Sequence, residues 1–123
     1  MKLPLEYRWL KANGFKGFIP WYLIEQLGKE ALRSEYQNET GKDFYPFAQR
    51  QDCDDVAGFE VINGAILTKV ITVHLTWSGK NERNGFPSCA EFDDMYDWIK
   101  KEVIPATLDW MSEEDLDELQ SNA

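Results

Sequence analysis

The chain has 123 residues, of which 43% are hydrophobic and 14% aromatic, and its formal net charge is −9. This composition supports one modest core and excludes intrinsic disorder, and no run of about 18 apolar residues is present that would cross a membrane. The first ten residues mix apolar and charged side chains, unlike a secretory signal peptide. We therefore expect a cytoplasmic domain in which Cys53 and Cys89 are free thiols.

The excess negative charge is confined to the last quarter of the chain. Residues 90–123 hold 11 of the 22 acidic residues and only 2 of the 13 basic ones, so residues 1–89 are neutral overall. This balance excludes nucleic acid as a partner, because phosphate binding needs a basic face. An acidic surface can steer a basic protein partner, and a device for solubility alone is the alternative.

The first forty residues predict helices separated by loops. A helix is expected over residues 3–12, whose apolar side chains share one face, and the Asn-Gly pair at 13–14 supplies its stop. The apolar, glycine-containing stretch 15–19 favours a loop. A second helix, opened by a proline, is expected over 20–27 and is expected to resume over 30–37.

The middle of the chain predicts an antiparallel meander. Strand character begins at Phe44 and is followed by a polar turn over 51–55 and a strand over 56–62. The Asn-Gly pair at 63–64 favours a two-residue type I′ hairpin turn, because both positions need a positive φ. The third strand, 65–77, alternates apolar and polar residues in its second half, which indicates one buried face and one partly wet face.

The last third of the chain predicts a loop followed by two helices. A loop is expected over 78–87, and the capping-box spacing that begins at Ser88 predicts a helix that ends at Pro105. Ser112 is expected to cap a last short helix whose leucines pack down onto the body. Acidic residues in the first turn of that helix suit the helix dipole.

Runs of helices and of strands, rather than their alternation, favour an α+β fold. We expect a single antiparallel or mixed sheet, arranged as a meander, with the helices packed on one side. No internal repeat or flexible linker interrupts the sequence. The simplest division is a domain over residues 1–105 and a short, helical, acidic C-terminal extension over 106–123.

Several segments of the chain resemble the SUKH superfamily, also called Smi/Knr-like. LPLEY at 3–7 with NG at 13–14 is similar to its "LPxxY…NG" element, and YPFA at 45–48 followed by QDCDDVAGF at 51–59 is similar to its "YPFA…DxDDxAxF" hairpin. FDDMYDWI at 92–99 resembles its closing helix. The family usually has a helix before the "LP" element, and the acidic extension is not part of its pattern.

This resemblance implies one sheet with flanking helices and a role in protein recognition. Bacterial members of the family are commonly immunity proteins that bind and neutralise a cognate toxin, often a nuclease, whereas eukaryotic relatives are scaffolding regulators of cell-wall synthesis. The family carries no recognised catalytic residues. The resemblance therefore implies a protein-binding domain without enzymatic activity or a cofactor, of the immunity type or, alternatively, a regulatory or scaffold module.

Asp52, Asp54 and Asp55 form an acidic cluster that invites a metal hypothesis. An EF-hand loop starting at Asp52 is excluded, because the residues at 56, 57 and 63 do not fit its pattern. The simplest interpretation is a polar turn whose carboxylates bind local backbone N–H groups. An exposed acidic knob that faces a partner is the second interpretation, and a metal site is the third.

His74 is the only histidine, so a triad or dyad mechanism would have to use it. It lies within a strand, and no nucleophile motif flanks it. Zinc could take Cys53, Cys89 and His74, although no CxxC or HxxxH spacing supports that set. A small metal-dependent hydrolase built on Asp52, Asp54 and His74 remains the least favoured function, and we expect no metal, cofactor or catalytic residue.

Candidate partner-binding residues are the acidic ones and the aromatic ones near turns. Trp110 and Met111 also lie near a turn and can stay partly exposed. The candidates are Trp21, Tyr22, Asp52, Asp54, Asp55, Glu113, Glu114, Asp115, Asp117 and Glu118.

Overall fold

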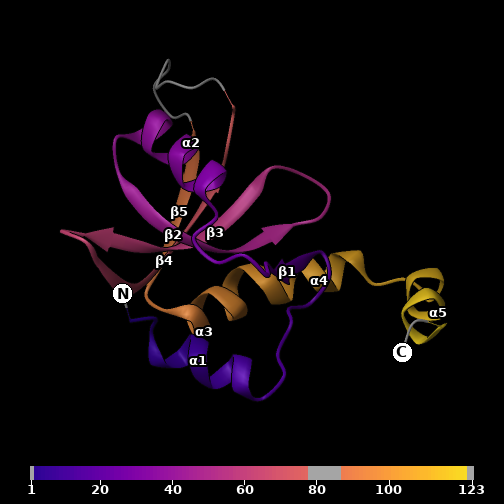
Figure 1. Cartoon of the computed structure of the whole chain (residues 1–123). Coiled ribbons are helices and arrows are strands. Elements are labelled where there is room, and N and C mark those ends of the chain that lie inside the picture. The colour runs from indigo at the N-terminus through magenta and orange to yellow at the C-terminus, as the bar shows by residue number, and fades with distance from the viewer. Residues whose placement is uncertain (1, 78–86, 122–123) are drawn as a thin grey trace.

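Five strands and the helices around them make up the fold, for which a computed structural model describes residues 2–77 and 87–121 (Figure 1). In chain order the elements are α1 (Leu5–Ala12), β1 (Trp21–Leu23), α2 (Glu30–Thr40), β2 (Asp43–Arg50), β3 (Asp55–Ile62), β4 (Ala65–His74), β5 (Ser88–Phe92), α3 (Met95–Trp98), the π-helical turn η1 (Ile99–Val103), α4 (Ile104–Trp110) and α5 (Glu113–Ser121). The loop expected over 78–87 lies outside the described residues except for its last residue.

Each strand of the sheet is hydrogen-bonded antiparallel to the next strand along the chain, in the order β1-β2-β3-β4-β5. This arrangement confirms the α+β class and the antiparallel meander. The β3–β4 hairpin turns at Asn63 and Gly64, whose φ angles are 51° and 78°. Positive φ at both central positions is the type I′ geometry expected of the Asn-Gly pair.

The central strands β3 and β4 are apolar on both faces of the sheet. Ala57, Phe59 and Val70 are buried on one face, and Val56 and Val73 are buried on the other. Helix α2 covers the second face, while α1, α3 and η1 cover the first (Figure 1). The expectation of helices on one side is therefore wrong, because a sheet that is apolar on both faces needs a cover on each.

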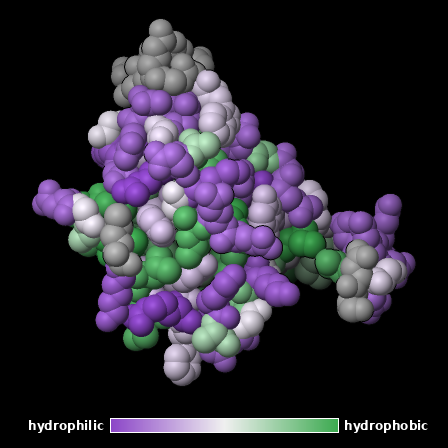
Figure 2. All heavy atoms as spheres, in the orientation of Figure 1, coloured by the Kyte–Doolittle hydropathy of each residue, from purple (hydrophilic) through white to green (hydrophobic). Residues whose placement is uncertain are grey.

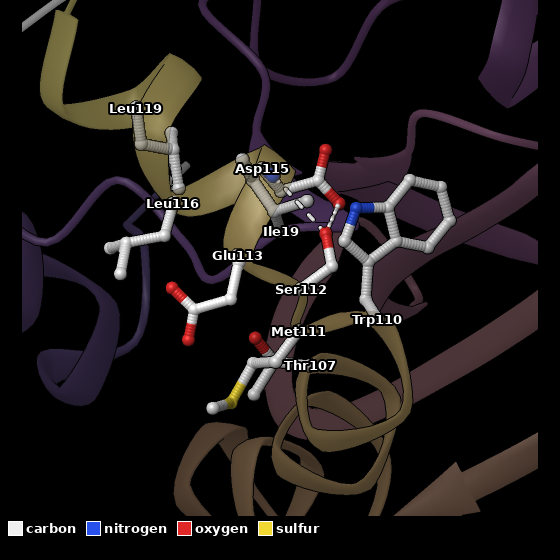
Figure 3. Close-up of a pocket in the computed structure, with 9 residues that line it drawn as sticks. All are labelled: Ile19, Thr107, Trp110, Met111, Ser112, Glu113, Asp115, Leu116 and Leu119. Atoms are coloured by element: carbon white, nitrogen blue, oxygen red, sulfur yellow. Dashed lines mark hydrogen bonds between the residues drawn. The ribbon is translucent and has the colours of Figure 1, made fainter.

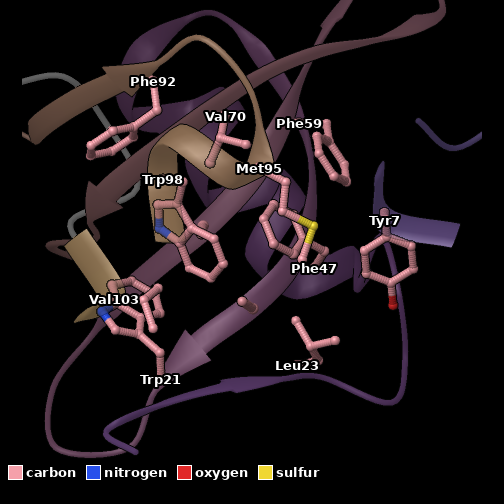
Figure 4. Close-up of a cluster of buried hydrophobic side chains, with 12 residues drawn as sticks. Tyr7, Trp21, Leu23, Phe47, Phe59, Val70, Phe92, Met95, Trp98 and Val103 are labelled. Carbon is pink, nitrogen blue, oxygen red and sulfur yellow. The ribbon is translucent and has the colours of Figure 1, made fainter. Parts of the chain in front are cut away.

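The larger core cluster is built from aromatic rings on the first face (Figure 4). The rings of Phe47 and Phe59 stack with centroids 4.4 Å apart, and Trp98 meets Phe47 edge-on at 5.1 Å. Trp21 meets Trp98 edge-on at 5.4 Å, and Tyr7 meets Phe47 edge-on at 5.9 Å. Such pairs add about 0.5–1.5 kcal/mol each beyond the area they bury. They hold β1, α1 and α3 on the same face of the sheet.

The smaller core cluster lies beneath α2. The rings of Tyr36 and Phe44 stack with centroids 4.0 Å apart, and burial raises the pKa of the Tyr36 hydroxyl to about 12. The ring of Phe44 lies over Gly58 of β3, where a Cβ atom would approach a ring carbon to 2.5 Å. A glycine is therefore needed at this strand position for the ring to pack down.

Glu39, which is 0% exposed, joins the end of α2 to the end of β4. Its carboxylate accepts hydrogen bonds from the backbone N–H of Thr76 at 2.9 Å, from the Thr76 hydroxyl at 2.7 Å and from the backbone N–H of Trp77 at 3.0 Å. Burial by itself raises the pKa of Glu39. These bonds and one from Glu35 outweigh burial, so the pKa lies below its ordinary value of 4.5.

Residues 20–27 form strand β1 and a loop instead of the expected helix. Trp21 and Leu23 are buried while Tyr22 between them is exposed, which is the period of a strand. Strand β1 pairs with the edge of β2, with Trp21 opposite Arg50 and Leu23 opposite Ala48. Pairing with β2 satisfies the backbone groups of this segment while both apolar side chains enter the core, and this decides its conformation.

The helix after the sheet begins and ends later than expected. Ser88 is the first residue of β5, which pairs with β4, so it opens no helix. The N-cap is Asp94, whose carboxylate accepts the N–H of Asp97 at 2.8 Å. The helix then continues past Pro105, which lies in the first turn of α4 directly after the π-helical turn η1. The wider turn accommodates a ring that would break a regular α-helix.

Replacing Glu39 by Gln should lower the free energy of unfolding by about 2–3 kcal/mol, since bonds to a charged acceptor are worth about 1.5–3 kcal/mol. Urea unfolding followed by tryptophan fluorescence measures the difference. The control is Glu25→Gln, the same change at an exposed side chain, which should alter stability by less than about 0.5 kcal/mol. Equal effects of the two variants would contradict the role of Glu39.

The contribution of Glu39 should also depend on pH. Because its folded pKa lies below the unfolded value of 4.5, the stabilisation is fully present above that pH and is lost as the pH falls through the folded pKa. The gap in unfolding free energy between the wild type and Glu39→Gln should therefore stay constant down to about pH 5 and shrink below it. A gap that widens on acidification would show that the folded pKa is raised instead.

Candidate functional site

The C-terminal helices α4 and α5 meet at a sharp, locally capped joint. Helix α4 ends at Trp110, and Met111 is extended. The hydroxyl of Ser112 accepts the backbone N–H of Asp115 at 3.1 Å and donates to the Asp115 carboxylate at 3.0 Å. This reciprocal pair confirms the cap expected at Ser112 and starts α5 in a new direction, away from the body of the protein (Figure 1).

A hollow of about 400 Å³ lies at this joint (Figure 3). Apolar side chains from three segments face it: one from the loop before β1, two from the end of α4 and the residue after it, and two from α5. Carboxylates of α5 stand beside them. We call this feature the acidic groove, and it is defined by Ile19, Trp110, Met111, Leu116 and Leu119 with Glu113, Asp115 and Glu118.

The apolar side chains of the acidic groove are largely open to solvent. Met111 is 68% exposed, and Leu116 and Leu119 are 47% and 50% exposed. Across α4 and α5 no residue is fully buried. Figure 2 shows hydrophobic side chains gathered where the C-terminal helix joins the body. An apolar patch rimmed by polar residues is typical of a surface that binds another molecule.

Helix α5 presents the expected acidic residues on an open surface. Glu113, Glu114, Asp117 and Glu118 are exposed, and Asp115 is half-buried by its bonds to Ser112. Glu113, Glu114 and Asp115 lie in the first turn, where the helix dipole favours negative charge. The helix contains no basic residue, so the negative potential beside the groove is uncompensated along its length.

The β2–β3 turn, which carries the other acidic candidates, lies at the same end of the molecule as α5. Gln51, the first residue of this turn, lines a smaller hollow of about 160 Å³ together with Asp115 and Glu118. Asp52 forms an ion pair with Arg50 at 2.7 Å, which holds the pKa of its carboxyl below the ordinary value. Asp52 is therefore largely neutralised, whereas the carboxylate of Asp54 is exposed.

Asp55 and Glu102 place two further carboxyl groups near this turn. The carboxylate of Asp55 accepts a hydrogen bond from His74 at 2.7 Å. Burial, and then the charge of Asp55, raise the pKa of the Glu102 carboxyl. The structure thus brings the acidic turn, η1 and α5 to one end of the protein, which their separation in sequence does not show.

The two aromatic candidates at the start of the sheet, Trp21 and Tyr22, differ in solvent exposure. Trp21 is 1% exposed and belongs to the core, so it does not offer its ring to a partner. Its position on the inward side of β1 explains this burial. Tyr22 points outward, is 41% exposed and stays available.

The three residues considered for zinc do not converge. His74 and Cys53 lie close together at the β2–β3 turn, with Asp55 as their third neighbour. Cys89 is paired with Val73, whose side chain lies beneath α2 on the opposite face of the sheet.

Sequence reasoning missed the apolar half of the acidic groove. Leu116 and Leu119 are expected to pack down onto the body, but both remain half-exposed because the body offers only Ile19 and the end of α4 beneath them. The partial exposure expected of Trp110 and Met111 is confirmed. The available signal was the helical spacing of leucines within a strongly acidic segment, which a buried helix would seldom have.

Comparisons of the chain with protein-family models, with curated proteins and with solved structures give no match. Among the helices of residues 2–77 and 87–121, none is long and apolar enough to cross a bilayer.

Truncation after Ser112 should leave the body of the protein folded. Because α5 buries none of its residues, its removal should cost less than about 1 kcal/mol of unfolding free energy. Trp98→Ala, which empties a core position, should cost about 3–5 kcal/mol and serves as the contrast. A loss in the truncated chain comparable with that of Trp98→Ala would show that α5 is part of the folding unit.

Proposed function

We propose that this chain is a non-catalytic, cytoplasmic protein-binding domain of the immunity type, which neutralises a cognate basic toxin domain by docking it on the acidic groove. The observation that carries the proposal is the exposed apolar lining of a hollow whose rim is acidic. The resemblance of the 3–7, 45–59 and 92–99 segments to the SUKH superfamily supports the same conclusion. The free, exposed thiols of Cys53 and Cys89 suit a reducing compartment.

The two halves of the acidic groove have different physical tasks. Large apolar side chains such as Trp110, Met111 and Leu116 supply affinity when a partner covers them and excludes water. The carboxylates of α5 raise the rate of encounter and select against acidic partners. A nuclease toxin carries a basic surface for phosphates, so an acidic surface of this kind is complementary to it.

The experiment that tests this proposal uses a panel of purified toxin domains. Binding of each domain to the chain is measured at low and high salt, together with the residual activity of the toxin. Support would be capture of one basic domain with loss of its activity. If the chain bound only partners without toxic activity, the regulatory or scaffold alternative would replace the immunity function. Binding that did not respond to salt would remove the electrostatic part of the argument.

Charge reversal on α5 should weaken capture of the toxin domain. The double variant Glu113→Lys/Glu114→Lys is expected to reduce affinity about tenfold at low salt, mainly through slower association. The matched control reverses two exposed charges elsewhere, Glu25→Lys/Glu30→Lys, and should change affinity by less than about threefold. Surface plasmon resonance measures both rates. Equal losses would show that only net charge matters and that the acidic groove is not the site.

A further inference from the structure

The pairing register of β3 and β4 places Asp55 directly opposite His74 at one end of the hairpin. Residues that face each other across an antiparallel pair project from the same face of the sheet. Accordingly, Nδ1 of His74 lies 2.7 Å from Oδ1 of Asp55. Both side chains remain partly open to solvent, with exposures of 50% and 28%.

The β2–β3 turn adds a sulfur atom to this pair. Ligand atoms of Cys53, Asp55 and His74 all lie within 4.8 Å of one another. Three ligands around a tetrahedral zinc ion would be separated from one another by about 3.3–3.8 Å, given bonds of about 2.0–2.3 Å. The sulfur has to move inward by at most about 1 Å, and the His–Asp pair has to open slightly. Cys53 stands on a turn, where such a shift disturbs no strand.

The surroundings of the three side chains favour a cation. Asp55 and His74 line a hollow of about 160 Å³, to which Glu102 of η1 and three residues of β5, Cys89 among them, also contribute. Asp52 does not line this hollow, and Arg50 donates to both of its carboxylate oxygens, at 2.7 and 3.2 Å. The hollow therefore offers nitrogen and carboxylate donors, with Glu102 as a second carboxylate. The sulfur of Cys53 lies beside it, within 4.8 Å of the ligand atoms of Asp55 and His74.

The chemistry of this donor set narrows the class of ion. Calcium and magnesium prefer oxygen ligands alone, so a thiolate and an imidazole argue against both. Zinc accepts Cys sulfur, His nitrogen and Asp oxygen in one tetrahedral site, and a set of three protein ligands leaves a fourth position for water or for Glu102. On binding, the Cys53 thiol would lose its proton to solvent.

We propose that Cys53, Asp55 and His74 form a binding site for zinc or a similar borderline divalent metal. A metal held there ties the β2–β3 turn to the end of β4. The site does not depend on the proposed partner binding, because its ligands come from the sheet and its turn rather than from the acidic groove. The zinc set considered from the sequence is Cys53, Cys89 and His74. In the structure, Asp55 takes the place of Cys89.

The test is titration of the reduced, chelator-treated protein with cobalt(II), followed by displacement with zinc. We expect one cobalt per chain, the visible bands of tetrahedral cobalt and a near-ultraviolet thiolate-to-cobalt charge-transfer band. Cys53→Ser should abolish the charge-transfer band, and His74→Gln should weaken cobalt binding at least tenfold. Circular dichroism should show that both variants stay folded, since both side chains lie at the surface.

Cys89→Ser is the matched control, because it makes the same chemical change at a second cysteine. Cys89 borders the same hollow, but it is paired with Val73, so its side chain projects with that of Val73 from the opposite face of the sheet. This variant should retain the charge-transfer band and the wild-type affinity. Zinc should raise the Tm of the wild type and of Cys89→Ser but not of Cys53→Ser. The proposal is overturned if the wild type shows no charge-transfer band, or if the two cysteine variants behave alike.

Discussion

Everything in this fold depends on a sheet whose central strands, β3 and β4, are apolar on both faces. Phe59 and Val70 require a cover on one side, and Val56 and Val73 require one on the other. Helix α2 supplies the second cover, and α1, α3 and η1 supply the first. Once both faces are closed, little apolar surface is left for α4 and α5. Ala106 of α4 still packs against the larger cluster, but Leu108, Met111, Leu116 and Leu119 stay exposed.

The acidic groove is a direct consequence of that arrangement. The cap at Ser112 turns α5 away from the body. The acidic residues of its first turn suit the helix dipole, but they do not cover the leucines of the helix, and no residue of α5 is buried. Leu116 and Leu119 are left facing Ile19 and the end of α4 across an open hollow. An apolar lining gives affinity and an acidic rim gives selectivity, and the proposed basic protein partner rests on this combination.

The same sheet register separates the two cysteines and brings together the residues of the proposed metal site. Asp55 and His74 come together because they are opposite in the β3–β4 ladder, and the turn before β3 brings Cys53 beside them. Cys89, one strand further on, projects from the other face. Sulfur, nitrogen and oxygen donors thus converge through strand pairing, although no spacing in the chain resembles a metal motif.

The sequence by itself determined the features that local chemistry controls: the α+β class, the Asn63-Gly64 turn and the cap at Ser112. In the turn and the cap, the backbone preference and the partner lie within a few residues of one another, and the class follows from the order of the helical and strand patterns along the chain. Only the tertiary structure decided that the segment at Trp21 is a strand, that α2 covers the far face, and that the acidic turn meets α5. These depend on which distant surface each segment buries against, and burial of apolar area outweighs the small differences in local propensity.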